Sequence, residues 1–149
     1  MNANEQREAT PQGNTVDQRG QRFGAAITTL VLIAALLTSS PWVIGWQFLV
    51  FALGAFIGLQ ASPYGWVFRH LIAPRLKGAP KPEAAAPPRF AQFVGFLFAA
   101  VAFVGLLAGQ ELVFLVATAL ALAAAFLNAA FGFCLGCQMY LLFARLRTN

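Results

Sequence analysis

Charged side chains are scarce in this sequence, and their scarcity indicates the class of protein. Of the 149 residues, 59% are hydrophobic and only 10% are Asp, Glu, Lys or Arg, whereas soluble domains have roughly 45–50% and about 25%. The composition therefore predicts a protein that lies in a lipid bilayer. Four membrane spans of about 20 residues each would use most of the chain, which excludes a sizeable soluble active-site domain.

Two further features are missing from the sequence. There is no basic helix or folded basic face, so the net charge of +5 does not predict nucleic-acid binding. There is also no pattern of a cleavable signal peptide, because a polar segment of 22 residues precedes the first apolar run. Residues 1–22 are rich in Asn, Gln, Glu, Arg and Gly without an apolar period, and we expect them to form a disordered cytoplasmic tail.

The apolar runs predict an all-α fold, an integral membrane four-helix bundle made of two helical hairpins. The expected four-span domain covers residues 23–147, with spans at about 23–39, 42–60, 90–108 and 112–144. Short turns connect the first span to the second and the third to the fourth. At about 1.5 Å per residue the fourth run is about 50 Å long, well above the hydrocarbon thickness of about 30 Å. We therefore expect this run to tilt, protrude or break, and Asn128, Gly132 and Gly136 favour a break near residues 128–136.

The long connection between the second and third spans is expected to contain an interfacial helix. From Tyr64 to Leu76, apolar side chains can share one side while cationic side chains reach toward water. Residues 78–88 are rich in proline and are expected to be an extended linker.

All ten cationic residues lie on one side of the predicted topology. They are Arg7, Arg19 and Arg22 in the tail, Arg69, Arg75, Lys77, Lys81 and Arg89 in the central connection, and Arg145 and Arg147 after the fourth span. The two turns on the other side carry only Glu111. Because cationic residues collect on the cytoplasmic side, both termini are expected in the cytoplasm, with the basic connection against anionic lipid. Trp42 and Trp46 would then mark the outer boundary of the bilayer. Tyr64 and Trp66 would mark the inner boundary.

The only two cysteines, Cys134 and Cys137, form a C-x-x-C motif near the end of the fourth run. At this spacing the two sulfurs lie on one face of a helix, close enough to form a disulfide. If a break places Cys134 at a helix N-terminus, the helix dipole favours the thiolate and lowers the pKa of this thiol. The pair is our candidate redox site near the cytoplasmic side, with Cys134 as the attacking thiolate and Cys137 as the resolving thiol.

Other roles for the cysteines stay open. Cysteine often serves as a small buried hydrophobe, so the two residues could simply pack. A dimer could offer four thiolates to a metal ion, although one chain supplies only two of the ligands. Attachment of a c-type haem is excluded because Gln138 stands where histidine is required. No span contains a carboxylate or a lysine, which disfavours proton-coupled transport, and we predict neither a bound cofactor nor a resident metal.

Three short stretches carry a resemblance to a known family. They are Ser62-Pro63-Tyr64, the segment from Pro87 to Ala91, and the segment from Phe131 to Cys137. Together they resemble a family of small bacterial membrane proteins catalogued as domain of unknown function 4395, over about Arg22 to Phe143. The resemblance implies a bacterial inner-membrane location and adds weight to Cys134 and Cys137, but it implies no mechanism.

Two functions fit these observations. In the first, the cysteine pair cycles between thiol and disulfide with a thioredoxin-like cytoplasmic protein, or handles a sulfur species. The outer side has no second cysteine pair, so electron transfer across the membrane would require a quinone or a partner subunit. In the second, the chain is an accessory subunit of a larger membrane complex or a homo-oligomer, with Gly54-x-x-x-Gly58 and Gly132-x-x-x-Gly136 as contact ridges. The sequence leaves open whether the protein is an enzyme.

Overall fold

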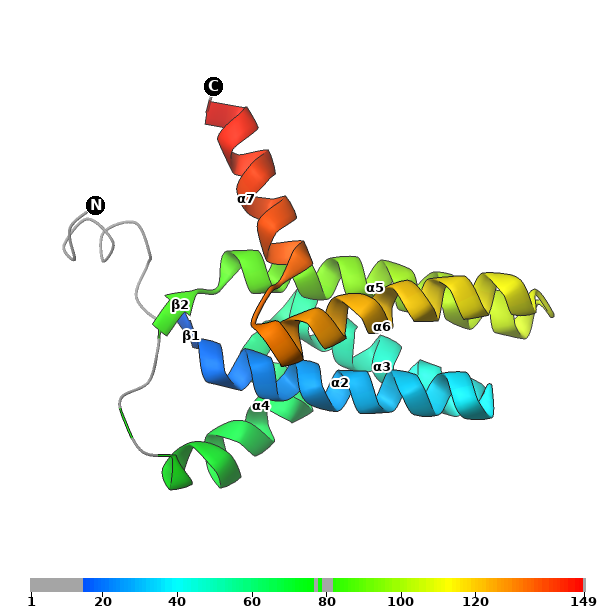
Figure 1. Ribbon diagram of the computed structural model, residues 1–149, viewed down its shortest axis with the longest axis horizontal. Helices are drawn as coiled ribbons and strands as arrows, with labels where there is room; N and C mark the ends of the chain where they lie inside the picture. The colour runs from blue at the N-terminus through cyan, green and yellow to red at the C-terminus, as the bar shows by residue number, and fades with distance from the viewer. Residues whose placement is uncertain (1–14, 77, 79–81, 149) are drawn as a thin grey trace.

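The computed structural model describes residues 15–76, 78 and 82–148, and these residues are almost entirely helical (Figure 1). Four apolar helices make up most of the fold. They are α2 (Gln18–Thr38), α3 (Pro41–Ala52) with its π-helical continuation η1 (Leu53–Ile57), α5 (Ala86–Leu107) and α6 (Glu111–Phe131). Helix α2 packs against α3 and α6, and α5 packs against α3 and α6. The prediction of an all-α protein is confirmed.

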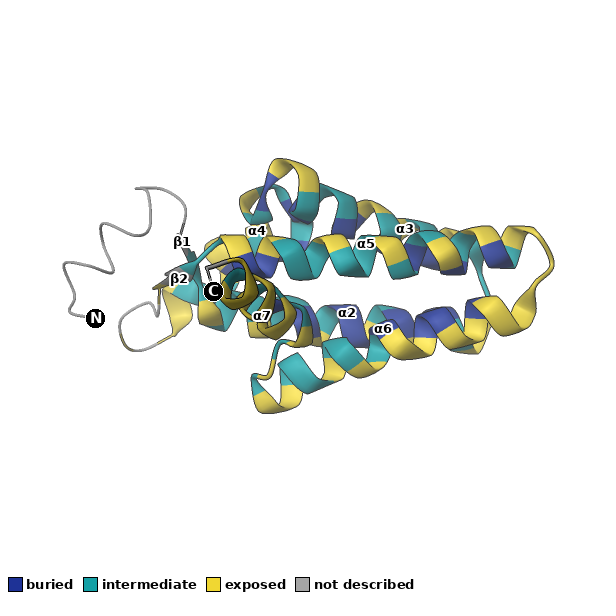
Figure 2. Cartoon of the chain, turned by 90° about the horizontal axis from the view of Figure 1, so that it is seen from above, coloured by how far each residue is buried: buried dark blue, intermediate teal, exposed yellow. Residues whose placement is uncertain are grey.

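Three of the four apolar helices, α2, α5 and α6, are long and apolar enough to cross a membrane. The fourth, Pro41–Ile57, is shorter, and at 1.5 Å per residue it extends about 25 Å. Many positions on the outside of these helices are exposed (Figure 2), and the apolar side chains Leu30, Val101 and Leu120 are all more than half exposed. Such an outer surface is suited to lipid, because contact with water would leave it unfavourably hydrated.

The tightly packed core lies in one half of the helical unit, near the short turns that follow α2 and α5. Its fully or nearly fully buried members are Leu32, Ala35, Ile44, Ala102, Phe114, Ala117 and Ala121. Alanine at four of these positions allows the helix backbones to approach closely. The other half of the unit, where α2 and α5 begin and α6 ends, is packed less densely.

The start of the chain differs from the expected disordered tail. Residues Thr15–Asp17 form strand β1, which pairs antiparallel with β2 (Pro82–Ala84), and α2 begins at Gln18. The carboxylate of Asp17 accepts the backbone N–H of Arg19 at 3.0 Å, which caps the helix five residues before the expected start. Residues 15–22 are thus strand and helix, while residues 1–14 of the expected tail lie outside the described residues.

The start of α5 also differs from its expected position. The helix begins at Ala86, within the segment that was expected to be extended. Pro87 and Pro88 lie in its first turn, where a helix leaves backbone N–H groups unpaired and proline therefore removes no hydrogen bond.

The connection that follows η1 is helical over most of the segment in which an interfacial helix was expected. After η2 (Leu59–Ala61), it consists of α4 (Pro63–Val67), η3 (Phe68–Ile72) and η4 (Ala73–Arg75). This segment runs beside the first part of α2 (Figure 1) rather than across the end of the unit. The indole Nε1 of Trp46 donates to the Tyr64 hydroxyl at 3.0 Å, so these two residues do not mark opposite membrane boundaries. That prediction is wrong because the chain changes direction at Gly58 (φ 143°), which brings Tyr64 back against α3.

The fourth apolar run is broken within the segment that the sequence indicates. Helix α6 ends at Phe131, Gly132 adopts a left-handed conformation (φ 69°) and α7 (Leu135–Thr148) follows. Glycine is favoured there because a side chain would clash in this conformation. Helix α7 stands across the long axis of the other helices in both views (Figures 1 and 2). Gly132 therefore caps a helix, and it does not form a packing ridge with Gly136.

The two ends of the helical unit differ in charge. The short turns after α2 and α5 lie at one end, and the first residues of α2 and α5 lie at the other (Figure 1). We call this second end the basic end, because the early helix positions there include Arg19, Arg22 and Arg89. Helix α7, which carries Arg145 and Arg147 in its last turn, leaves the unit from the same end.

Candidate functional site

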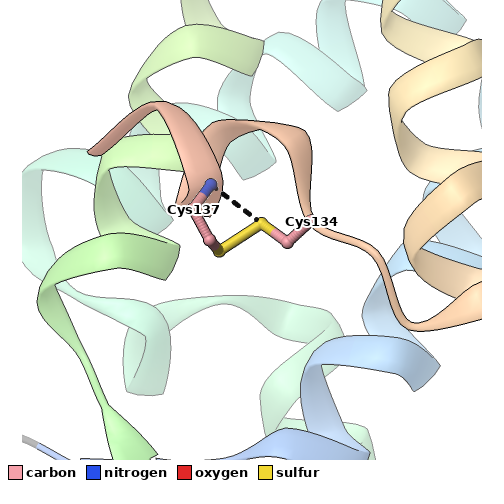
Figure 3. The surroundings of a disulfide bond; sticks show 2 residues. All are labelled: Cys134 and Cys137. Carbon is pink, nitrogen blue, oxygen red and sulfur yellow. Dashed lines mark hydrogen bonds between the residues drawn. A yellow bond between two sulfur atoms is a disulfide. The ribbon is translucent and has the colours of Figure 1, made fainter. Parts of the chain in front are cut away.

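Cys134 and Cys137 are joined by a disulfide at the start of α7 (Figure 3). Their Cα atoms are 5.2 Å apart, a usual separation for a disulfide. Cys134 directly precedes α7, and Cys137 lies in its first turn. The structure thus brings together the two residues that the sequence singles out.

Cys134 occupies the N-cap position of α7. The backbone N–H of Cys137 donates to Sγ of Cys134 at 3.2 Å (Figure 3), and the backbone N–H of Gln138 donates to the Cys134 carbonyl at 3.1 Å. The sulfur therefore takes the place of the side-chain oxygen that Ser or Asp provides at a helix start. Since a helix N-terminus stabilises negative charge, this position suits a thiolate when the disulfide is reduced.

The two sulfurs differ in accessibility. Cys137 is only 5% exposed, whereas Cys134 is partly exposed and lines the wall of a cavity. A reactant can therefore approach Cys134 more easily than Cys137. This difference agrees with the roles proposed from the sequence, in which Cys134 meets the partner and Cys137 resolves.

Helix α7 is held in place by contacts with the start of α5. A Cβ atom placed on Gly136 would lie 2.6 Å from Cα of Ala91, so the two backbones are in direct contact. The ring of Phe90 packs against Tyr140 and Phe143, with centroid distances of 5.9 and 6.3 Å. These contacts fix the direction of α7 and with it the position of the disulfide.

A cavity of about 610 Å³ lies between the helices in the half of the unit toward the basic end. All of the longer helices contribute to its wall, which is largely made of small and apolar residues. The wall includes Thr28, Tyr64, Gln92, Ala124, Asn128 and Cys134. The disulfide therefore borders a space large enough for a small molecule.

A buried chain of hydrogen bonds forms one part of the cavity wall. The Tyr64 hydroxyl donates to Oε1 of Gln47 at 2.8 Å, and Nε2 of Gln47 donates to the Thr28 hydroxyl at 3.4 Å. Gln47 is completely buried, and Tyr64 is 8% exposed. Burial raises the pKa of Tyr64, and the hydrogen bond from Trp46 lowers it by less. Tyr64 is therefore a neutral donor at ordinary pH.

Two side chains on the cavity wall carry an amide group without a hydrogen bond to any described residue. Gln92 lies near the start of α5, and Asn128 lies in the last turn of α6. Among the residues that the structure describes, neither side chain makes a hydrogen bond, and both are partly exposed to the cavity. Because an unpaired amide in apolar surroundings is unfavourable, these two groups favour a polar atom inside the cavity.

A family model covers nearly all of the described fold. The family described as "Domain of unknown function (DUF4395)" matches residues 16–145, from β1 to the last turns of α7. The chain belongs to this family. The resemblance noted in the sequence is thereby confirmed. Comparison with curated proteins and with solved structures gave no match.

Two arginines in this DUF4395 chain have structural roles that the sequence did not indicate. Arg22 donates to the carbonyl oxygens of Ala129 and Ala130 at 3.2 and 3.4 Å, at the end of α6. Arg89 donates to the carbonyls of Ala55 and Phe56 at 3.1 and 3.5 Å, at the end of η1. In the sequence Arg22 was part of the expected tail. The signal that could have found it is the repeated Arg-Phe pair at 22–23 and 89–90, since each pair stands at the start of an apolar run.

Proposed function

We propose that this protein is a thiol–disulfide redox protein of the bacterial inner membrane, whose Cys134 and Cys137 cycle between dithiol and disulfide at the cytoplasmic side. The observation that supports this most is the position of Cys134. Its sulfur caps a helix N-terminus, accepts the Cys137 N–H and is the more accessible of the two. Those are the properties that make a cysteine reactive toward thiols and disulfides.

The exchange follows from these positions. A thiolate of a cytoplasmic dithiol protein of the thioredoxin-like kind attacks Sγ of Cys134, the S–S bond breaks, and Cys137 leaves as a thiolate that takes a proton. The second thiol of the partner protein then attacks the sulfur that the partner contributes to the mixed disulfide. This releases Cys134 as a thiolate and oxidises the partner. In the reverse direction Cys134 attacks and Cys137 resolves, so the mixed disulfide always involves Cys134.

The membrane arrangement is part of the proposal. Each of the four apolar helices crosses the bilayer, with Pro41–Ile57 near the short limit of what can span it. The basic end faces the cytoplasm, as the distribution of cationic residues favours. Helix α7 then lies along the inner membrane surface, where Arg145 and Arg147 contact water and lipid headgroups.

Labelling of introduced cysteines with a membrane-impermeant maleimide tests this orientation. In a Cys134→Ser, Cys137→Ser background, cells with an intact inner membrane should be labelled at Ser40→Cys, in the outer turn, and not at Arg75→Cys. Labelling of Arg75→Cys in such cells would overturn the orientation.

Trapping of the mixed disulfide tests the redox function. The Cys137→Ser variant should accumulate a covalent adduct with the disulfide form of a cytoplasmic thioredoxin-like protein, because Cys134 attacks that disulfide and no Cys137 thiol is present to resolve the mixed disulfide. The matched Cys134→Ser variant should not. In native membranes, maleimide gel shifts before and after reduction should show an oxidised pair. If the pair never oxidises and the two variants behave alike while the protein assembles normally, the cysteines serve only in packing, as in an accessory subunit.

A further inference from the structure

We infer that the cavity beside Cys134 binds the ring of a lipid-soluble quinone, and that this quinone is the electron acceptor of the cysteine pair. The inference rests on the proposed redox function and adds the second substrate to it. It is supported by three observations: the number of cysteines, the position of the cavity and the polar groups on its wall.

A disulfide that receives two electrons becomes a dithiol, which must pass these electrons on before the pair can act again. The whole sequence contains only Cys134 and Cys137, so no second cysteine pair in this chain can take the electrons. A soluble dithiol protein reaches the pair from the water side. The bilayer around the apolar helices offers a second direction of approach, from which a lipid-soluble reactant can reach the pair.

The cavity lies where a membrane-soluble reactant would meet the sulfur. Its volume of about 610 Å³ is within the range of about 300–1,000 Å³ that is usual for sites of small molecules. Cys134 lines it directly, whereas Cys137 does not. The small side chains of Ala124 and Ala125 on α6 leave room for a flat ring between the helices.

The polar groups of the wall fit a neutral ligand that has carbonyl oxygens. The side-chain amides of Gln92 and Asn128 come from two different helices and lack hydrogen-bond partners among the described residues. Both can donate an N–H group to a carbonyl oxygen. The charged groups of the wall are engaged elsewhere, Asp17 with Arg19 at 2.9 Å and Arg69 with the Gln60 carbonyl at 2.8 Å. A quinone combines an apolar ring with two carbonyl oxygens and has no charge.

The reaction is a two-electron oxidation of the pair. The Cys134 thiolate and the Cys137 thiol form the S–S bond and give up two electrons. The quinone takes up these electrons with two protons, one from the Cys137 thiol and one from solvent, and becomes a hydroquinone. A fully substituted quinone ring offers no open carbon for addition of a thiol, so electron transfer is then the expected outcome.

The test uses the purified full-length protein in lipid nanodiscs and a ubiquinone analogue that has a fully substituted ring and a ten-carbon tail. The protein is first reduced and freed of reductant. Hydroquinone formation is followed by absorbance and disulfide formation by maleimide gel shift. Ala124→Phe fills the cavity from α6, whereas Ala123→Phe places the same ring on an exposed position of the same helix.

Wild type and Ala123→Phe should form one hydroquinone per chain, and Ala124→Phe should be at least about tenfold slower. Gln92→Leu should raise the quinone concentration for half-maximal rate about tenfold, a factor that corresponds to one lost hydrogen bond. All variants should still be reduced by a thioredoxin-like dithiol protein at the wild-type rate, which shows that they are folded. If Ala124→Phe does not fold, Ala125→Leu replaces it as the cavity-filling variant.

Two results would overturn the inference and leave the proposed function intact. One is that the wild-type protein exchanges with the dithiol protein at the normal rate but the quinone does not oxidise its cysteine pair. The other is equal quinone oxidation in wild type and in the folded cavity-filling variants, which would show that quinone reaches the sulfur by another route. Failure of wild type to exchange with the dithiol protein would instead overturn the proposed function itself.

Discussion

Gly136 and Ala91 are in backbone contact, since a methyl group on Gly136 would lie 2.6 Å from both Cα and Cβ of Ala91. This contact joins α7 to α5 one residue before Cys137. The direction in which α7 leaves the helical unit, and so the placement of the disulfide beside the cavity, depends on it.

Gly136→Ala should therefore loosen α7. Backbone atoms would have to move to admit the methyl group, and overpacking of this kind destabilises by about 1–3 kcal/mol. We expect a lower thermal midpoint in detergent and faster proteolysis between α6 and α7. Gly24→Ala is the control, because its added methyl would meet only Cβ of Tyr64 at an ordinary 3.8 Å. Equal midpoints for the two variants would contradict the close contact.

Arg22→Gln should fray the end of α6. Its guanidinium donates to carbonyls in the last turn of that helix. The helix dipole also favours a positive charge at this end. Loss of the guanidinium should therefore speed hydrogen exchange in the final turn of α6 by about fivefold. Arg75→Gln removes the same charge from an exposed position at the end of η4. Exchange at the end of α6 that is the same in both variants would show that the hydrogen bonds of Arg22 are not needed there.

Tyr64→Phe should be costly because it leaves the fully buried Gln47 without its donor. The expected loss is about 1–3 kcal/mol, measured by chemical or thermal unfolding in detergent. Gln47→Leu in the same chain removes the unpaired acceptor as well, so the double variant should lose less than the sum of the two single variants. Strict additivity would show that the two side chains are not coupled.

The same tyrosine gives a pH dependence. Burial raises the pKa of Tyr64 above its ordinary value of 10.0, so the folded protein holds this proton more tightly than the unfolded chain. Its contribution to stability is complete below pH 10 and decreases as the pH rises toward the raised value. The difference in unfolding midpoint between wild type and Tyr64→Phe should shrink above pH 10. A difference that stays constant up to pH 11 would contradict a buried neutral phenol.

The sequence predicts the features of this fold that depend on local properties. Apolar runs locate α2, α3, α5 and α6 because a helix that faces lipid must be apolar over its length. The break before α7 is visible because Gly132 stands where the apolar run exceeds the bilayer thickness. The placement of residues 15–17 was missed because β1 pairs with β2, a segment distant in the sequence whose short strand has no apolar alternation of its own.

Tertiary contacts explain the other differences. The position of α4 depends on hydrogen bonds of Tyr64 with Trp46 and Gln47, and no spacing in the sequence indicates these partners. The cysteine pair was found because C-x-x-C is a local motif. The cavity was not predicted, because its wall combines residues from all the long helices. Each of these helices alone has the composition of an ordinary membrane helix.

The two arginine caps link the halves of the chain to each other. Arg22 in the first half donates to carbonyls at the end of α6 in the second half, while Arg89 in the second half donates to carbonyls at the end of η1 in the first half. Each half thus supplies hydrogen-bond donors for helix-end carbonyls of the other half, and these carbonyls lose those donors when the halves are apart. The two halves of the fold therefore depend on each other, and α7 with the disulfide is positioned on a unit that both arginines help to close.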